Sequence, residues 1–307
     1  MAFDAGMLAA ALWETTAAVK DGRVEKISQP EHDEIILQIR AGNASHRLLI
    51  NAGANNPRLG LTAAARENPP SPPPFCIMLR KYLSGARLCS LEQIGFERVT
   101  EFRFDTRDEM GFPTVHFLVA ETMGKYSNLM LLDGDRKIIG VLRPVDFTTS
   151  SMRQVLPGMR YELPPAQDKI DPLDETGDTF LSRLASAPPD KTAEKWLCAT
   201  YLGLSAAVAR EMVFLAAGDT EATVGSAGQK LADVFIDTML AIRQGRFSPC
   251  VVWEGTKPLE YAFLPLTHYS GCRLQSDVTP GGALDLFFES RDRDMRLKQR
   301  AADLLHV

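Results

Sequence analysis

The sequence contains few residues of the kinds that bind metals or form disulfides. Its 307 residues include five cysteines and five histidines, and neither set has the close spacing of a ligand group. Structural zinc sites use paired cysteines such as Cys-x-x-Cys, and disulfide frameworks belong to short chains that are dense in cysteine. We therefore expect no metal, no cofactor and no disulfide framework, and we expect a reducing, cytoplasmic location.

Long apolar runs and the glycine motifs of common enzymes are also missing. No run approaches the roughly 20 apolar residues that cross a bilayer. The N-terminal stretch, MAFDAGMLAAALWETTAAVK, has no basic region ahead of its apolar residues, so it predicts a helix and not a signal peptide. The sequence has no Gly-x-Ser-x-Gly elbow, no Walker loop and no Gly-x-Gly-x-x-Gly turn. We therefore expect a globular protein that spans no membrane and is not an enzyme.

The formal net charge of −5 argues against a surface that binds polyanions everywhere, but it leaves room for a local basic patch. Positive charge is concentrated in one stretch, interleaved with Tyr82 and Phe96. Its cations are Arg80, Lys81, Arg87, Arg98, Arg103 and Arg107. One interpretation is a patch that follows phosphates, with an aromatic ring that stacks on bases, as in single-stranded RNA recognition. The plainer alternative is a solvated helix edge with ion pairs to Glu97 and Glu101.

Within the same stretch the sequence predicts a helix followed by a strand. Prolines 72–74 suit the start of a helix and Gly85 suits its end. From Arg98 the apolar pattern has a period of two, with Phe102 and Phe104 on one side. Arg98 shares the parity of these aromatic residues, which is unusual for a guanidinium unless it is paired or binds a ligand.

Residues 121–128, ETMGKYSN, form a second feature in which charged, aromatic and amide side chains surround a glycine. As a plain β-bulge the segment needs no function. As a recognition loop it offers Lys125, Tyr126 and Asn128 together. Further on, Arg143 closes a predicted strand, where an arginine is more often structural.

The chain divides into four predicted segments with an α+β fold. Residues 1–172 have short alternating segments between proline and glycine turns, which predict a β-rich lobe built as an antiparallel sandwich or barrel. An acidic linker ends this lobe. Residues 173–245 are helical, and residues 246–290 return to strand patterns, including a strand at 284–289. Residues 291–307 predict the start of a coiled-coil helix, so we expect the chain to be part of something longer.

The helical segment contains a helix–turn–helix pattern around Gly203, Leu204 and Ser205. Such a pattern is similar to a helix-hairpin-helix, whose turn amides hold a nucleic-acid phosphate. Ser205 stands where that motif usually has a second glycine. An ordinary helical hairpin is therefore the preferred interpretation from the residues alone.

Four segments occur together, in order: PPPFCIMLRKYLSGARL, IGFERVTEFRF, ETMGKYSNLMLLD and LPGMRYELPP. They resemble the N-terminal domain of the NFACT family, which includes proteins described as fibronectin-binding protein A and ribosome quality-control factors. The last segment, DRDMRLKQRAADLL, resembles the family's entry into a coiled-coil arm. The resemblance implies a β-rich lobe similar in fold to the N-terminal domain of formamidopyrimidine-DNA glycosylases. A helix-hairpin-helix module and a small C-terminal β segment would follow it.

The resemblance also implies a function in ribosome-associated quality control. Family members bind the large ribosomal subunit that carries a stalled peptidyl-tRNA. They recruit tRNA, here expected to be alanine tRNA, for C-terminal alanine tailing of the nascent chain. Because the ribosome performs the peptide transfer, such a factor is a tRNA-binding adaptor and not an enzyme.

The resemblance assigns tRNA recruitment to particular positions. The family's Asp-Arg pair falls on Glu97 and Arg98, with glutamate in place of aspartate. Its Glu-Ile-Met motif falls on residues 121–123, with threonine in place of isoleucine. With the basic patch and the glycine loop added, the expected tRNA-binding residues are Glu97, Arg98, Glu121, Thr122, Met123, Arg80, Lys81, Arg87, Lys125, Tyr126 and Asn128.

Two other functions have to be weighed. The family's older name suggests a surface adhesin for fibronectin, but the missing signal peptide and the unpaired cysteines argue against it. A DNA glycosylase would attack with an N-terminal proline amine beside a glutamate, whereas this chain begins Met1-Ala2-Phe3. Zinc-finger cysteines are absent too, and fold similarity alone does not imply an activity.

Overall fold

The computed structural model describes residues 3–291, which divide into two compact units. One unit contains residues 11–168, and the other contains residues 169–291 together with residues 3–10. The division falls close to the acidic linker where the sequence predicts a boundary. Within residues 3–291, no helix combines the length and the apolarity needed to cross a membrane.

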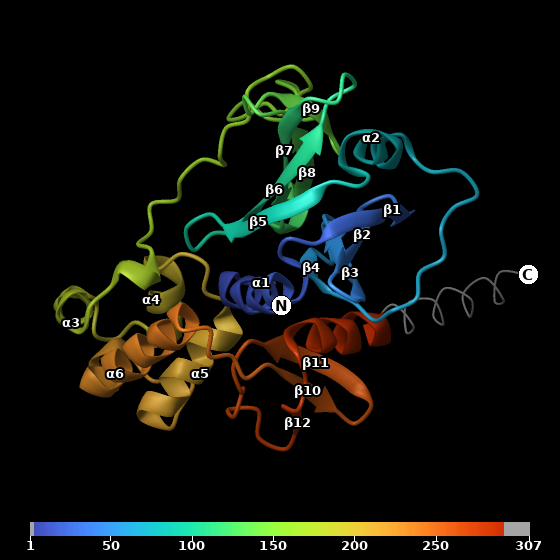
Figure 1. The fold of residues 1–307 in the computed structure, drawn as a ribbon. Helices are drawn as coiled ribbons and strands as arrows, with labels where there is room; N and C mark the ends of the chain where they lie inside the picture. The colour runs from blue at the N-terminus through green and yellow to red at the C-terminus, as the bar shows by residue number, and fades with distance from the viewer. Residues whose placement is uncertain (1–2, 292–307) are drawn as a thin grey trace, which may run out of the picture. The chain divides into compact units, whose positions relative to one another are not determined.

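The first unit is built on an antiparallel sheet of nine strands in the order β4-β3-β2-β1-β5-β6-β7-β8-β9 (Figure 1). Helix α1 (Ala5–Val19) precedes the strands and α2 (Pro74–Leu83) lies between β4 and β5 in the chain. The strands are β1 (Arg23–Glu31), β2 (Glu34–Ala41), β3 (Ala44–Asn51), β4 (Arg58–Leu61), β5 (Arg87–Gln93), β6 (Val99–Arg107), β7 (Pro113–Glu121), β8 (Asn128–Leu132) and β9 (Ile138–Val141).

The sheet has two halves that are joined by very little pairing. Strands β1 and β5 share one residue pair, Arg23 with Arg87, whereas β6 and β7 pair along their whole length. Figure 1 shows strands β1–β4 in blue and strands β5–β9 in cyan to green as distinct groups. The predicted antiparallel, β-rich lobe is therefore present, and the break between its halves is a feature of the tertiary structure.

Helix α2 follows the proline run as predicted. Pro74 occupies its first turn, where the missing amide proton costs nothing. Its buried side chains are Phe75, Cys76, Leu79 and Leu83. Gly85 follows with a φ of +74°, a left-handed value that glycine adopts without strain.

The core beside β6–β9 is closed by the segment that follows the sheet. Buried Val99, Val119 and Met130 pack with Val155 and Tyr161, which come from that later segment. A bridge between Val145 and Val155 holds the segment in a short loop. The chain after β9 is therefore part of this core and not a free linker.

The second unit is helical, with a small sheet. Its helices are α3 (Gly177–Ser186), α4 (Ala193–Thr200), α5 (Ala206–Ala217) and α6 (Val224–Arg243). Phe180, Trp196, Tyr201 and Phe235 form an aromatic core, with the Phe180 and Phe235 ring centroids 4.6 Å apart. Strands β10 (Cys250–Glu254), β11 (Lys257–Ala262) and β12 (Arg273–Gln275) form a sheet in the order β11-β10-β12.

The strand expected at 284–289 is wrong, because residues 280–291 are helical. Ala283, Leu284, Phe287 and Phe288 are all buried, and their spacing is that of one helix face. A short apolar run does not distinguish a strand from a buried helix by itself. Apart from Arg291, the predicted coiled-coil segment at 291–307 lies outside the described residues.

Candidate functional site

The Glu97–Arg98 pair lies in the turn between β5 and β6, immediately before the first residue of β6. The expectation that Arg98 belongs to the strand, on its aromatic side, is wrong. The ladder between β6 and β7 starts at Val99, opposite Glu121. Because Arg98 precedes the strand, its side chain does not follow the alternation of buried and exposed side chains in β6. Both Glu97 and Arg98 are partly exposed.

The carbonyl of Arg98 joins this turn to the second predicted motif. It accepts hydrogen bonds from the amide of Thr122 at 2.9 Å and from the Thr122 hydroxyl Oγ1 at 3.2 Å. The β5–β6 turn and the residues after β7 therefore lie side by side. Two motifs that are separate in the sequence form one site.

Glu97 is held by the last residue of β5 and by the segment that leaves the unit. Gln93 donates a side-chain hydrogen bond to the Glu97 carbonyl at 2.9 Å. Gln167 Nε2 donates to the two Glu97 carboxylate oxygens at 3.3 Å and 3.5 Å. A neutral donor therefore limits the movement of this partly exposed carboxylate.

Glu121 is buried and fully engaged, so its predicted direct contact with RNA does not fit this geometry. Arg153 donates to both carboxylate oxygens, at 2.7 Å and 3.0 Å, and the Tyr161 hydroxyl donates to one of them at 2.9 Å. Only 2% of Glu121 is exposed. Burial and the neighbouring Glu121 charge raise the pKa of Tyr161 well above its ordinary value. Through these contacts with Arg153 and Tyr161, Glu121 fixes the start of the 121–128 loop to the core of the unit.

Thr122 and Met123 also face inward. Thr122 is buried, and Met123 packs against the core beside β6–β9. Glu121 and Thr122 therefore support the site from within, and the partly exposed Met123 adds its packing to the same core. We expect these residues to affect ligand binding by fixing the positions of the Arg98 turn and of the Gly124–Tyr126 turn.

Lys125 and Tyr126 are the side chains of this loop that face solvent. They lie on a short turn (Gly124–Tyr126) whose first residue has a φ of +61°. Tyr126 is 69% exposed, and the Lys125 ammonium lies 4.9 Å from the centre of its ring. A cation and an open aromatic face are thus presented together.

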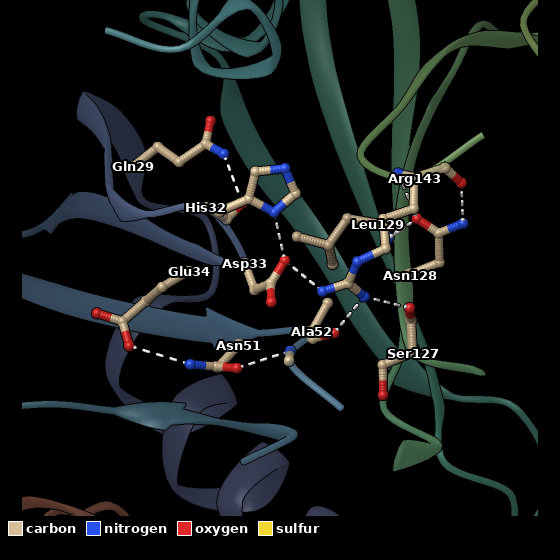
Figure 2. Close-up of polar contacts among 11 residues, drawn as sticks. Gln29, His32, Asp33, Glu34, Asn51, Ala52, Ser127, Asn128, Leu129 and Arg143 are labelled. Atoms are coloured by element: carbon tan, nitrogen blue, oxygen red, sulfur yellow. Dashed lines mark hydrogen bonds and ion pairs between the residues drawn. The ribbon is translucent and has the colours of Figure 1, made fainter. Parts of the chain in front are cut away.

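Asn128 and Arg143 form a structural clasp beneath the loop (Figure 2). The Asn128 amide Nδ2 donates to the Arg143 carbonyl at 2.7 Å, and its Oδ1 accepts from the Arg143 amide at 3.0 Å. The Arg143 guanidinium then donates to the carbonyls of Ala52 and Ser127 and contacts Asp33. It thereby connects the residues just before β2 and just after β3 with the residue just before β8, across the two halves of the sheet. Arg143 is structural, as predicted. Asn128 is buried, and both polar atoms of its side chain already bind the backbone of Arg143.

Three of the predicted cations lie away from this site. Lys81 pairs with Glu109 at 3.0 Å, Arg87 pairs with Asp21 at 2.8 Å, and Arg80 donates to the Ile27 carbonyl at 2.8 Å. Glu109 follows the end of β6 and Arg87 begins β5, whereas Arg98 lies at the opposite end of both strands. Nine residues of strand extend about 26 Å. The predicted basic patch is therefore not one surface.

The ion pairs suggested for the plainer interpretation have different partners. Arg103 lies 3.4 Å from Asp105, and Arg107 donates to the Gly111 carbonyl. Glu101 is instead gripped by Arg136, whose two terminal nitrogens lie 2.6 Å and 2.8 Å from its oxygens. Much of the positive charge of this stretch is therefore neutralised locally.

Sequence reasoning missed Arg153, Tyr161 and Gln167, which hold the site together. Tyr161 lies in LPGMRYELPP, one of the segments that carry the family resemblance, so a signal for it was present. Arg153 and Gln167 have no local pattern that indicates a partner. Within residues 3–291, no group of three or more His, Cys, Asp or Glu side chains is arranged to hold a metal ion.

Residues 4–307 match the family model described as NFACT N-terminal and middle domains. The chain belongs to the NFACT family. It is 34% identical over 305 residues to the Rqc2 homolog RqcH of Bacillus subtilis (strain 168). That alignment covers 99% of this chain and 52% of the relative, so the chain spans about half the length of this curated NFACT protein.

Solved structures of two bacterial proteins have the same fold. The N-terminal part of the fibronectin/fibrinogen-binding protein from Streptococcus suis matches with a TM-score of 0.76 at 28% identity, covering 94% of this chain and 99% of that chain. The fibrinogen binding protein from Staphylococcus aureus matches with a TM-score of 0.76 at 29% identity, covering 93% and 98%. The α+β architecture is therefore that of NFACT N-terminal regions.

Proposed function

We propose that this chain is the tRNA-binding and ribosome-binding part of a ribosome quality-control factor. The relative named Rqc2 homolog RqcH supports this assignment, since it aligns over nearly the whole chain. The observation that carries it is the pair of hydrogen bonds from Thr122 to the Arg98 carbonyl. They bring the Arg98 turn beside the Lys125–Tyr126 turn, and these two turns form the proposed tRNA contact.

The exposed groups of the two turns match the chemistry of a nucleic acid. The Arg98 guanidinium and the Lys125 ammonium suit phosphate oxygens, and the Tyr126 ring suits stacking on an unpaired base. The Glu97 carboxylate can accept a hydrogen bond from a base amino group or from a ribose hydroxyl. Glu121, Thr122, Met123 and Asn128 contribute by fixing the turns.

The wider function follows from the same assignment. The factor would recruit tRNA, with alanine tRNA expected, to a large subunit that carries a stalled peptidyl-tRNA. Alanine tailing would then proceed by the ribosome's own peptide transfer, so the factor acts in the cytoplasm as an adaptor and not as an enzyme. The β-rich lobe would share the architecture of formamidopyrimidine-DNA glycosylases without their chemistry.

The hairpin of α4 and α5 would keep the form of a helix-hairpin-helix but serve in packing. The Ser205 hydroxyl donates a hydrogen bond to the Asp4 carboxylate at 2.5 Å, and the amide of Ala5 donates to the Gly203 carbonyl at 3.0 Å. A carboxylate at the turn repels a phosphate. We therefore assign the tRNA contact to the first unit and not to this turn.

The test is to sequence the RNA that co-purifies with the full-length protein and with two variants. Arg98→Ala should lose tRNA, by about tenfold or more if its charged hydrogen bonds are lost. Arg103→Ala is the matched control, because Arg103 lies in the same stretch but pairs with Asp105. Retention of tRNA by folded Arg98→Ala protein would contradict the site, and loss in both variants would point to charge alone.

Fibronectin binding is the second candidate, favoured by the description of the similar Streptococcus suis protein as fibronectin/fibrinogen-binding. It predicts specific fibronectin binding by intact, unlysed cells that make the full-length protein. Loss of that signal on deletion of the gene would support an adhesin. Equal binding by cells with and without the protein would exclude it.

A further inference from the structure

Strand β5 has one paired edge and one edge that is largely open. It pairs with β6 from Arg87 to Gln93, but with β1 only at Arg87. Gly22 and Asp21 complete the hydrogen bonds of Leu88. From Cys89 to Glu92, no strand among the described residues pairs with the edge that faces away from β6.

A cavity of about 190 Å³ lies along this edge. It is lined by Leu88, Ser90, Leu91 and Glu92 of β5 and by Thr16 and Lys20, at the end of α1 and just after it. Leu88 and Leu91 make its wall largely apolar, whereas Lys20 and Glu92 are exposed and charged. Since a water takes about 30 Å³, the cavity has room for an incoming side chain.

The two charges lie at opposite ends of the open edge. Lys20 precedes Asp21, whose amide donates to the Leu88 carbonyl, and Glu92 lies four residues further along β5. Four strand residues span about 13 Å. Neither charge has an ion-pair partner among residues 3–291. The residue opposite Glu92 on β6 is another carboxylate, Glu101, and the Arg136 guanidinium nearby is already bound to Glu101.

We propose that this groove binds an extended peptide, which adds to β5 as an antiparallel strand. An acidic side chain of the peptide meets Lys20, a basic side chain meets Glu92, and an apolar side chain between them enters the cavity. The strand pairs of this unit are antiparallel, and antiparallel pairing is slightly the more stable per residue. In that direction the basic residue precedes the acidic residue by four positions, on the same face of the strand.

An isolated strand fits the groove better than a second copy of the chain. A second copy would have to bring its own α1 and the charges beside it against the same edge. A single peptide has no such flank, and its backbone supplies the hydrogen bonds that the edge lacks.

The first experiment measures the binding of short fluorescent peptides to the full-length protein by anisotropy. The probe has the core Lys-Thr-Val-Thr-Glu, and its partner has the reversed charges, Glu-Thr-Val-Thr-Lys. The first peptide should bind about tenfold more tightly. The double variant Lys20→Glu, Glu92→Lys should prefer the second peptide. The same exchange at Glu254 and Lys257, a hairpin pair of the other unit, is the control and should change nothing.

The second experiment separates strand addition from charge attraction alone. Methylation of the peptide amides that face β5 should weaken binding about tenfold or more, because each lost hydrogen bond leaves a polar group unpaired. Hydrogen exchange of the Ser90 to Glu92 amides should slow when the peptide binds. Binding that is unchanged by amide methylation, or no binding at all, would overturn the proposal. Lys20 and Glu92 would then be charges that protect a strand edge from aggregation. Arg98→Ala should bind the peptide normally, so the result does not depend on the tRNA site.

Discussion

Thr122 fixes the backbone of Arg98 with two hydrogen bonds to one carbonyl, from its amide at 2.9 Å and from its hydroxyl at 3.2 Å. The family motif that this segment resembles has isoleucine at the same place, and isoleucine has no hydroxyl. The threonine of this chain therefore adds a side-chain bond to the backbone bond. Both residues branch at Cβ, but threonine is smaller than isoleucine by one carbon, so the change exchanges apolar volume for a polar contact.

Thr122→Val should keep the turn in place but loosen it. The variant preserves the shape and the amide bond, and it removes one buried hydrogen bond, at a cost of about 0.5–1.5 kcal/mol in the free energy of unfolding. Urea unfolding measures the cost, and tRNA recovery measures its effect on the site. A loss above about 3 kcal/mol would mean that the hydroxyl does more than hold Arg98.

Glu121→Gln should destabilise the first unit strongly, because Arg153 would keep a charge in a site that is nearly closed to solvent. The Arg153 side chain is only 14% exposed. Breaking a buried pair from one side costs about 3–5 kcal/mol, whereas removing both charges costs less. The double variant Glu121→Gln, Arg153→Met should therefore be more stable than Glu121→Gln alone, as measured by denaturant unfolding.

The exposed Glu162 provides the control for this cycle. Its backbone carbonyl contacts Arg153, whereas the buried pair itself consists of the Arg153 guanidinium and the Glu121 carboxylate. Glu162→Gln should therefore change the free energy of unfolding by no more than about 0.5 kcal/mol. Equal stability of the single and double variants at Glu121 and Arg153 would show that the two side chains are not coupled.

Lys81→Ala and Arg87→Ala should leave tRNA recovery within about twofold of the parent protein, because exposed ion pairs contribute little and lie far from Arg98. Lys81 pairs with Glu109, and this pairing raises the pKa of Lys81. The comparison is with Arg98→Ala under the same salt concentration, since phosphate contacts weaken with salt. Losses as large as that of Arg98→Ala would restore the single basic patch that the sequence suggested.

Glu211 should give the second unit part of its acid sensitivity. It is buried and accepts hydrogen bonds from Thr267 and from His268, whose ring Nδ1 lies 2.6 Å away. Burial raises the pKa of Glu211, but these hydrogen bonds outweigh burial and leave the pKa below its ordinary value. A lowered folded pKa means stability that is present above the ordinary value of about 4.3 and is lost as pH falls through the folded pKa.

The measurement is denaturant unfolding of the second unit between about pH 6 and pH 3, compared with Glu211→Gln. The variant should be less stable at neutral pH and should lose less stability on acidification. His268→Gln is a useful companion variant, because the His268 ring is a hydrogen-bond partner of Glu211. Parallel pH profiles for both proteins would assign the acid sensitivity to other groups.

Local signals account for much of what the sequence predicted correctly. The proline run and Gly85 set the bounds of α2, since proline fixes φ and glycine alone takes a left-handed φ without strain. Alternating apolar residues predicted β6 and β7, which pair along their full length. The same signals failed at residues 280–291, where the spacing of Ala283, Leu284, Phe287 and Phe288 fits a helix but the run is too short to exclude a strand.

The sequence by itself determined the local elements and the two motifs at Glu97 and Glu121, because caps, turns and periodicity act over a few residues. Only the tertiary structure decided which of the predicted residues share a surface. It brought the Arg98 and Tyr126 turns together through Thr122, buried Glu121 against Arg153, and separated Lys81 and Arg87 from them by the length of a strand. These outcomes depend on strand order and on partners that are distant in the chain. The sequence alone does not show whether a given carboxylate faces solvent or pairs with an arginine.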